Sequence, residues 1–226
     1  MIYLSLWTGL TCLLYYVNLH LYRRWRKLWL APVIATSFVL ALLIGLSGLS
    51  FQQYLDSTRW MLWMVGPLTL AMAAPVYQHR AYVRRWWLPL TLGTLTATLT
   101  ALGSAALLAH WLHLPAEMAR SLMARSISLP FAFAVSDELS GARDLTTLFV
   151  IVSGTLGLVL GDIALAFLPV RSDQARGATL GAVANVMGAM KAHEHSPAGG
   201  VMASLTMVFS GVLTIVVAPL FSALAG

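Results

Sequence analysis

Arg125, Ser126 and Ser128 lie at the start of a short apolar segment near the middle of the chain. An arginine side chain can hold a carboxylate through two parallel hydrogen bonds, and neighbouring hydroxyls can fill the acceptor sites that remain. These three residues therefore predict a binding site for a small organic acid. The alternative is an arginine at the membrane interface whose side chain extends to the lipid headgroups.

A glycine-rich segment, RGATLGAVANVMGAMKAHE (176–194), is the second candidate for a site. Glycine lowers the stability of a helix and lets backbones approach closely, so this segment is predicted to pack tightly or to break. Irregular backbone at membrane depth is tolerated only where protein or a water-filled cavity satisfies its polar groups. Asn185 lies between Gly181 and Gly188, and its amide could donate to a substrate oxygen or hydrogen-bond to a neighbouring helix.

Three charged residues fall within or beside apolar runs. Asp162 interrupts such a run, which favours either a role in proton or cation coupling or an interfacial position near a helix end. Lys191 and Glu194 are three residues apart and are expected to pair on one helical face. His193 and His195 flank Glu194, but this spacing directs the two rings apart on a helix, so no metal site is predicted.

The sequence carries no pattern for enzymatic chemistry. It has no GxSxG motif, no phosphate-binding loop and no catalytic spacing of its serine and histidine residues. We therefore expect neither an enzyme activity nor a cofactor.

Composition assigns the chain to the membrane. Of its 226 residues, 59% are hydrophobic and only 10% are charged, with a mean hydropathy of +0.79, whereas soluble domains carry about 25% charged residues. The length allows about seven or eight membrane crossings and leaves no separate soluble domain. The net charge of +6 comes from short basic clusters between apolar runs, which encode topology and do not indicate nucleic-acid binding.

The apolar runs span about residues 2–22, 28–51, 60–77, 86–112, 145–168 and 201–224. Gly66 and Pro67 interrupt the third run, and a kink or break is expected there because proline removes a helix hydrogen bond and clashes with the preceding turn. Between residues 115 and 144 the apolar core is ISLPFAFAV. Nine residues are too short to span a bilayer, so this region is predicted to be re-entrant or broken.

The basic clusters at 23–27, 80–85 and 171–176 fall on one side of the membrane if the 115–144 region enters and leaves by the same face. The positive-inside rule makes that side cytoplasmic and places the N-terminus outside; a full crossing would put the last cluster outside. The later runs then form two inverted trios with interrupted middle members, 60–77 and 176–194. Such pairs indicate the midplane site of a secondary transporter, although glycine and proline are common in membrane helices and the match could be coincidental.

From about Trp60 to the C-terminus, several motifs resemble the LrgB/CidB family of bacterial inner-membrane proteins. The matching segments are RSISLP (125–130), LFVIVSGTLGLVLG (148–161), ARGATLG (175–181), AGGVMASLTMVFSGVLTIVVAPL (198–220) and, earlier, VGPLTLAMAAPVYQ (65–78). The order Gly188, Lys191, Glu194 agrees as well.

The chain departs from the family pattern at five positions in the suspected site. Arg125 replaces a lysine, Leu129 a threonine, Asp162 a proline, Asn185 a histidine and Ala189 a threonine. Asparagine cannot titrate as histidine does, so any proton coupling must involve another group. The departures indicate a divergent substrate or weakened transport.

The resemblance implies an all-α inverted-repeat transporter with crossed discontinuous helices, in one membrane domain over residues 1–226. It implies transport of small monocarboxylates, of the glycolate, lactate or pyruvate type, across a bacterial inner membrane by alternating access. The expected substrate-binding residues are Arg125, Ser126, Ser128, Pro130, Gly181, Asn185, Gly188, Lys191 and Glu194, with Asp162 a candidate for coupling to H⁺ or Na⁺.

The family also implies a different class of function. Members were described as holin-like or antiholin-like modulators of murein hydrolases and cell lysis, which would act through a small LrgA/CidA-type membrane partner. A homodimer formed through the first helices is also compatible with the sequence, since residues 2–51 lie mostly outside the matching motifs.

Overall fold

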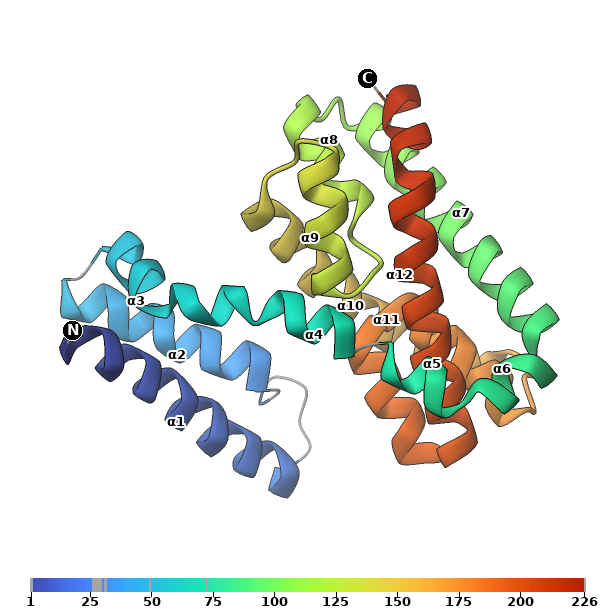
Figure 1. Ribbon diagram of the computed structural model, residues 1–226, viewed down its shortest axis with the longest axis horizontal. Coiled ribbons are helices and arrows are strands. Elements are labelled where there is room, and N and C mark those ends of the chain that lie inside the picture. Colours follow the sequence, from blue (N-terminus) through green and yellow to red (C-terminus); the bar gives the residue numbers. More distant parts are fainter. Residues whose placement is uncertain (1, 26–29, 31, 49, 72, 226) are drawn as a thin grey trace. The chain divides into compact units, whose positions relative to one another are not determined.

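The computed structural model describes residues 2–25, 30, 32–48, 50–71 and 73–225, and every regular element within these ranges is a helix (Figure 1). The predicted all-α class is therefore confirmed. By its internal contacts the chain divides into two compact units, Met1–Pro67 and Leu68–Gly226.

The first unit contains α1 (Ile2–Trp25), α2 (Pro32–Ser47) and α3 (Phe51–Trp63). Side-chain hydrogen bonds join these apolar helices. Asn18 Nδ2 donates to Thr36 Oγ1 at 3.0 Å, and Trp60 Nε1 donates to Thr8 Oγ1 at 3.1 Å. Such bonds hold membrane helices together where there is no hydrophobic driving force between them.

The predicted break near Gly66 and Pro67 lies at Met64, between α3 and α4 (Val65–Ala71). Both predicted residues fall in the first turn of α4. Proline is tolerated there, because the first turn of a helix has no partner for its N–H groups.

In the second unit, α5 (Ala74–Gln78) and α6 (Arg80–Arg85) precede three helices long and apolar enough to cross a membrane. These are α7 (Trp87–Trp111), α10 (Arg143–Phe167) and α12 (Pro197–Ala225). The expected seven or eight crossings are not confirmed by the described residues. The segment between α7 and α10 and the segment between α10 and α12 fold as helical hairpins instead.

The first hairpin consists of α8 (Ala116–Met123), a turn at residues 124–128, and α9 (Leu129–Glu138). Its base lies against the beginning of α10. The Ala142 amide donates to Ser121 Oγ at 2.9 Å, and Thr146 Oγ1 donates to Ser136 Oγ at 2.9 Å. The region therefore enters and leaves by the N-terminal end of α10, which is the re-entrant arrangement predicted from its short apolar core.

The second hairpin is α11 (Asp173–His195), which the sequence presented as one interrupted run. Asn185 has φ 51° and ψ −131°, a conformation that breaks the helix. A Cβ added to Gly188 would lie 1.9 Å from the Leu180 carbonyl oxygen. Residues eight apart in a straight helix are separated by about 12 Å along its axis, so the chain folds back on itself at Asn185.

The second hairpin enters from the opposite end of α10. At its base, Lys191 Nζ lies 2.9 Å from Asp162 Oδ2. Near its turn, Val183 lies against Gly157, where a Cβ would be 2.1 Å from the Val183 carbonyl oxygen. Its halves, residues 173–184 and 186–195, are about 18 and 15 Å long at 1.5 Å per residue. They therefore extend about half-way through a hydrocarbon core of about 30 Å.

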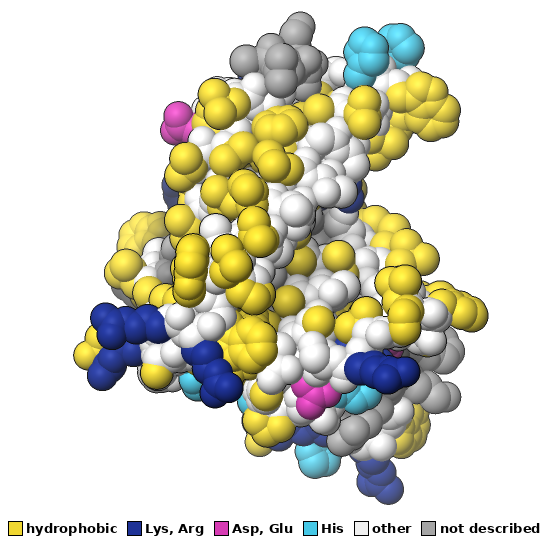
Figure 2. Space-filling model, turned by 90° about the vertical axis from the view of Figure 1, so that its right-hand side faces the viewer, with side chains coloured by type: hydrophobic (Ala, Val, Ile, Leu, Met, Phe, Trp, Pro, Cys, Tyr) yellow, Lys and Arg dark blue, Asp and Glu magenta, His cyan; other side chains and the backbone are white. Residues whose placement is uncertain are grey.

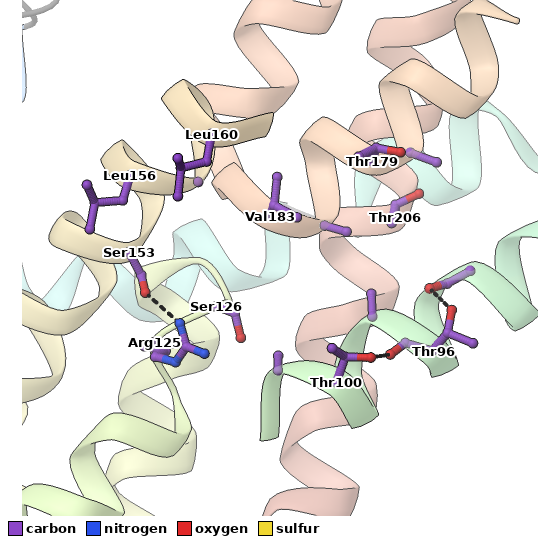
Figure 3. Close-up of a pocket in the computed structure, with 16 residues that line it drawn as sticks. Thr96, Thr100, Arg125, Ser126, Ser153, Leu156, Leu160, Thr179, Val183 and Thr206 are labelled. Atoms are coloured by element: carbon purple, nitrogen blue, oxygen red, sulfur yellow. Dashed lines mark hydrogen bonds between the residues drawn. The ribbon is translucent and has the colours of Figure 1, made fainter. Parts of the chain in front are cut away.

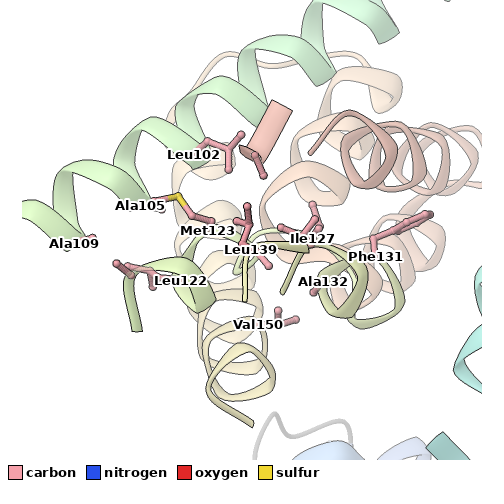
Figure 4. Packing of buried hydrophobic residues seen from close by; sticks show 14 of the residues in the cluster. Leu102, Ala105, Ala109, Leu122, Met123, Ile127, Phe131, Ala132, Leu139 and Val150 are labelled. Carbon is pink, nitrogen blue, oxygen red and sulfur yellow. The ribbon is translucent and has the colours of Figure 1, made fainter. Parts of the chain in front are cut away.

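Hydrophobic packing holds the first hairpin in place (Figure 4). Leu122, Met123, Ile127 and Phe131 belong to one buried cluster with Leu102 of α7 and with side chains of α10 and α12. The cluster fixes the turn at 124–128 between α7, α10 and α12. Separating these apolar side chains from their neighbours would remove many favourable van der Waals contacts.

Two of the predicted basic clusters lie at one end of this unit. Residues 80–85 precede the start of α7, and Arg171 and Arg176 flank the start of α11. Leu90 of α7 and Ala178 of α11 pack in one hydrophobic cluster, which brings these two ends together. Figure 2 shows Lys and Arg side chains mostly toward the lower end of the face in view, with hydrophobic side chains above them. For these two clusters the predicted common side agrees with this arrangement, whereas the third predicted cluster, 23–27, lies partly outside the described residues.

The predicted pairing of two interrupted membrane segments is not confirmed in the described residues. The sequence paired the interrupted run 60–77 with 176–194, but residues 60–77 are divided among α3, α4 and α5. The α8–α9 hairpin folds back beside α10, as α11 does.

Candidate functional site

A cavity of about 640 Å³ lies between α7, the turn of the first hairpin, α10 and α11 (Figure 3). Arg125 and Ser126 contribute to its wall, and Thr206 of α12 closes one side. Most of the other lining side chains are small or apolar: Gly93, Ala97, Ala101, Leu156, Gly157, Leu160, Ala178, Ala182 and Val183. The cavity thus offers one cation and a few hydroxyls in a largely apolar surrounding, the usual character of a small-molecule site.

Arg125 is held in place by two neutral side chains. Its Nη2 donates to Ser104 Oγ at 2.8 Å, and its Nη1 donates to Ser153 Oγ at 3.1 Å. Its Nε is buried and has no partner among the described residues. No carboxylate within the described part of the chain lies within ion-pair distance of the guanidinium. The positive charge therefore remains available to an anion.

The partners of Arg125 place it well below the end of the bundle. Ser104 is seven residues before the end of α7, and Ser153 is ten residues after the start of α10. At 1.5 Å per residue these positions lie about 10 and 15 Å from the helix ends. A group that deep in a membrane protein usually faces a cavity and has a functional role. This position does not agree with an arginine that extends to the headgroups.

Ser128 and Pro130 begin α9 and do not line the cavity. Ser128 is the N-cap residue and is buried, and a proline in the first turn suits a helix start. The N-terminus of α9 is thereby fixed at the turn of the hairpin, next to Arg125. Unpaired N–H groups and the helix dipole add positive potential at this point.

Asn185 lies at the turn of the second hairpin and is 6% exposed. Its side-chain Nδ2 has no hydrogen-bond partner in the described structure and lies near Gly154 of α10. Asn185 does not contribute to the wall of the cavity, although Ala182 and Val183 of the same turn do. Asn185 thus forms the break in α11, and its side-chain Nδ2 has no hydrogen-bond partner among the described residues.

The glycines predicted for binding have a packing role instead. Gly181 lies against Ala203 of α12, where a Cβ would be 2.2 Å from the carbonyl oxygen. Gly188 lies against Leu180 within the hairpin. Both permit backbone contacts that any larger residue would prevent.

The charged residues of α11 lie at the base of the second hairpin. Lys191 pairs with Asp162 and not with Glu194 as expected, because the fold-back directs the second half of α11 toward α10. Glu194 is exposed. The cavity is not lined by Lys191, Asp162 or Glu194. These charged residues are therefore separate from the site that contains Arg125 and Ser126.

Two residues that hold Arg125 were not predicted from the sequence. Ser153 lies within the matching segment LFVIVSGTLGLVLG, so the family motif indicated its importance but not its hydrogen bond with Arg125. Ser104 lies in an ordinary apolar run on α7. Nothing in the local sequence distinguishes it, because its role depends on a neighbour 21 residues away.

Comparisons with known proteins identify the family of the chain. Residues 11–224 match the model of the LrgB-like family. The chain is 30% identical to Bacillus subtilis YwbG over 210 residues, which cover 93% of both chains. It is 26% identical to the holin-like protein CidB of Staphylococcus aureus (93% of this chain and 92% of CidB) and 25% identical to the antiholin-like protein LrgB of Bacillus subtilis (88% and 84%). No solved structure matches the chain. Because the family model covers nearly the whole sequence, this membrane protein belongs to the LrgB-like family.

Proposed function

We propose that the protein transports a small organic monoanion across the bacterial inner membrane by alternating access. The observation that carries this proposal is the unpaired charge of Arg125. The side chain lies in a cavity at membrane depth, bonds only to two serine hydroxyls, and has no carboxylate partner among the described residues. A buried charge without a counter-ion is costly, so an anionic ligand would complete the site.

The chemistry of the wall favours a single carboxylate. Arg125 is the one charged residue that lines the cavity in the described part of the chain. Its guanidinium can hold one carboxylate by two hydrogen bonds, and the neighbouring Ser126 hydroxyl can bond to the same group or to a substrate hydroxyl. A second negative charge would face apolar side chains. Glycolate, lactate and pyruvate have one carboxylate and a small polar group, so they fit these requirements.

The two hairpins provide the architecture for alternating access. α7 is followed by the α8–α9 hairpin, and α10 is followed by the α11 hairpin, which is the order of elements that two inverted repeats would have. Their turns meet beside residues 153–157 of α10. Each hairpin is a thin barrier between the cavity and one side of the membrane, which is the arrangement that inverted repeats supply in secondary transporters.

The competing proposal is a holin-like or antiholin-like regulator. The names of the relatives CidB and LrgB support it, and such a protein would act through a small LrgA/CidA-type partner. It does not require a ligand for Arg125. A ligand-binding experiment therefore separates the two proposals.

The test is the thermal unfolding of the purified protein in detergent, with glycolate, lactate and pyruvate present at increasing concentration. A ligand that binds only the folded state raises Tm by mass action. We expect at least one acid to raise Tm in the unchanged protein, and we expect the shift to disappear in Arg125→Ala. Arg120→Ala is the matched control, because Arg120 is exposed on the same hairpin.

If Arg125→Ala fails to fold, Arg125→Lys keeps the positive charge but loses the second parallel hydrogen bond. We expect this variant to bind the same acid about tenfold more weakly. A folded, unchanged protein whose Tm does not respond to any of the three acids would exclude them as ligands and would favour the partner-dependent regulator.

A further inference from the structure

We propose that a small polar chamber behind the main cavity binds a sodium ion that couples to the organic anion. This inference rests on the proposed function only for the coupling, since binding of the ion itself is tested without any acid. The chamber has a volume of about 10 Å³, enough for one ion or one water molecule. It shares four lining residues with the main cavity: Ala97, Ala101, Ser126 and Ala182.

Two hydroxyls in the chamber have no hydrogen-bond partner among the described residues. Thr98 of α7 is 3% exposed and Ser210 of α12 is 4% exposed, and their side-chain oxygens are fully buried. Thr206, one turn before Ser210, has the same property and lines the main cavity. A buried hydroxyl that is left without a bond carries a desolvation penalty, so the two such groups in the chamber indicate a ligand there.

Neighbouring hydroxyls show that this is not the general behaviour of the two helices. Thr94 Oγ1, one turn before Thr98, donates to the Leu90 carbonyl at 2.7 Å. Thr214 Oγ1, one turn after Ser210, donates to the Ser210 carbonyl at 2.7 Å. Threonine and serine in a helix usually form such bonds within their own helix. The hydroxyls of Thr98 and Ser210 have not done so.

The chemistry of the chamber favours a small monovalent cation. Hydroxyl oxygens are the hard, neutral ligands that alkali and alkaline-earth ions accept. Ala182 lies in the last turn before the break at Asn185, and Ser126 follows the end of α8. The position of Ala182 is the C-terminal end of a half-helix, whose free carbonyls and negative dipole end stabilise a cation. Among the described residues no carboxylate lines the chamber, so a divalent ion would lack compensating charge, and the small volume favours Na⁺ over K⁺.

Arg125 makes the ion and the anion depend on each other. Ser126 lines both spaces, and Figure 3 shows its side chain beside that of Arg125 at the turn of the hairpin. The positive guanidinium repels a cation in the chamber when no anion is bound. A carboxylate on Arg125 removes this repulsion, so each ligand should raise the affinity of the other by the same factor.

The first experiment measures Tm of the purified full-length protein without acid, in NaCl, KCl and choline chloride at constant ionic strength. We expect Tm to rise with NaCl and not with KCl or choline chloride. Thr98→Val keeps the shape of the side chain and removes its hydroxyl, and Ser210→Ala removes the second hydroxyl. Both variants should fold in choline chloride and lose the response to sodium.

Thr94→Val is the matched control, because Thr94 is a buried threonine of the same helix with a satisfied hydroxyl. It should keep the full response to sodium. The second experiment measures the affinity for the acid that shifts Tm, in NaCl and in choline chloride. We expect the affinity in NaCl to be at least about fivefold higher in the unchanged protein, and equal in both salts for Thr98→Val.

The outcomes separate the two proposals. If sodium has no effect on Tm while an acid still raises it through Arg125, the chamber holds only water and the sodium site is overturned, but the proposed function stands. If sodium raises Tm and no acid does, the ion site is supported and transport of these acids is not. If Thr94→Val loses the sodium response together with Thr98→Val, the effect does not arise in the chamber and the inference fails.

Discussion

The two hairpins that meet beside α10 turn in different ways. The α8–α9 hairpin turns through residues 124–128 and presents Arg125 and Ser126 to the cavity. The α11 hairpin turns at one residue, Asn185, and its contribution to the cavity wall includes no charge. The first turn therefore supplies the chemistry of the site. The second supplies close backbone contacts.

The hairpins also differ in how they pack against α10. The first is held by a large hydrophobic cluster and by side-chain hydrogen bonds at Ser121 and Ser136. The second touches α10 through backbone at Gly157, where the carbonyl of Val183 leaves no room for a Cβ, and through a smaller hydrophobic cluster that includes Leu158 of α10 and Leu180 of α11. We infer that the geometry of the second hairpin depends on small residues, whereas that of the first depends on apolar volume.

The largest effect is expected from Gly157→Ala. The added Cβ would lie 2.1 Å from the Val183 carbonyl oxygen, so backbone must move. We expect the free energy of unfolding to fall by about 2–3 kcal/mol, the range of overpacked sites. The measurement is denaturant unfolding in detergent micelles. Gly103→Ala is the control, because no atom lies within 4 Å of its added Cβ, and alanine in a helix should raise stability by up to about 1 kcal/mol. Equal effects would contradict the glycine-dependent contact.

A smaller effect is expected at the break itself. Asn185 has a positive φ, which glycine adopts without steric conflict and alanine does not. Asn185→Ala should therefore lower the free energy of unfolding by about 1–2 kcal/mol, whereas Asn185→Gly should leave it unchanged or raise it. Thermal unfolding of both variants checks this. If glycine were as destabilising as alanine, the amide, and not the backbone conformation, would determine the turn.

The smallest effects are expected from the ion pairs that tie each hairpin to α10. Asp137 pairs with Arg143 in the first and Lys191 with Asp162 in the second, and all four side chains are partly exposed. Either pair should contribute about 0–1 kcal/mol, measured by a double-mutant cycle. A coupling energy well above this range would show that the pair is screened from solvent.

The first pair also predicts a weak dependence of stability on pH. The hydrogen bond from Arg143 lowers the pKa of the Asp137 carboxyl, and partial burial opposes this shift. The contribution of this ion pair to the free energy of unfolding is therefore complete above the ordinary aspartate pKa of about 3.9. It is lost as pH falls through the lower pKa that Asp137 has in the folded protein. The decrease in Tm between pH 7 and pH 3 should be slightly smaller in Asp137→Asn, and an equal decrease would contradict the shift.

The sequence by itself determined that this protein consists of membrane helices, and it indicated Arg125, the charged side chain that lines the cavity. Composition and run lengths require membrane helices, and nine apolar residues cannot span a bilayer, so the first hairpin was predictable. An arginine beside serines at that place also predicts an anion site, which stays a prediction, and the family match covers nearly the whole chain.

Only the tertiary structure decided that α11 folds back at Asn185, that Lys191 pairs with Asp162, and that Ser104 and Ser153 hold Arg125. The glycines of α11 were compatible with a kinked crossing and with a hairpin, because glycine permits both a helix break and close backbone contact. The choice depends on backbone contacts with Gly157 and Ala203 on two other helices. Periodicity along one segment contains no information about those helices, so the fold-back and the contacts that it creates could not be predicted from the sequence.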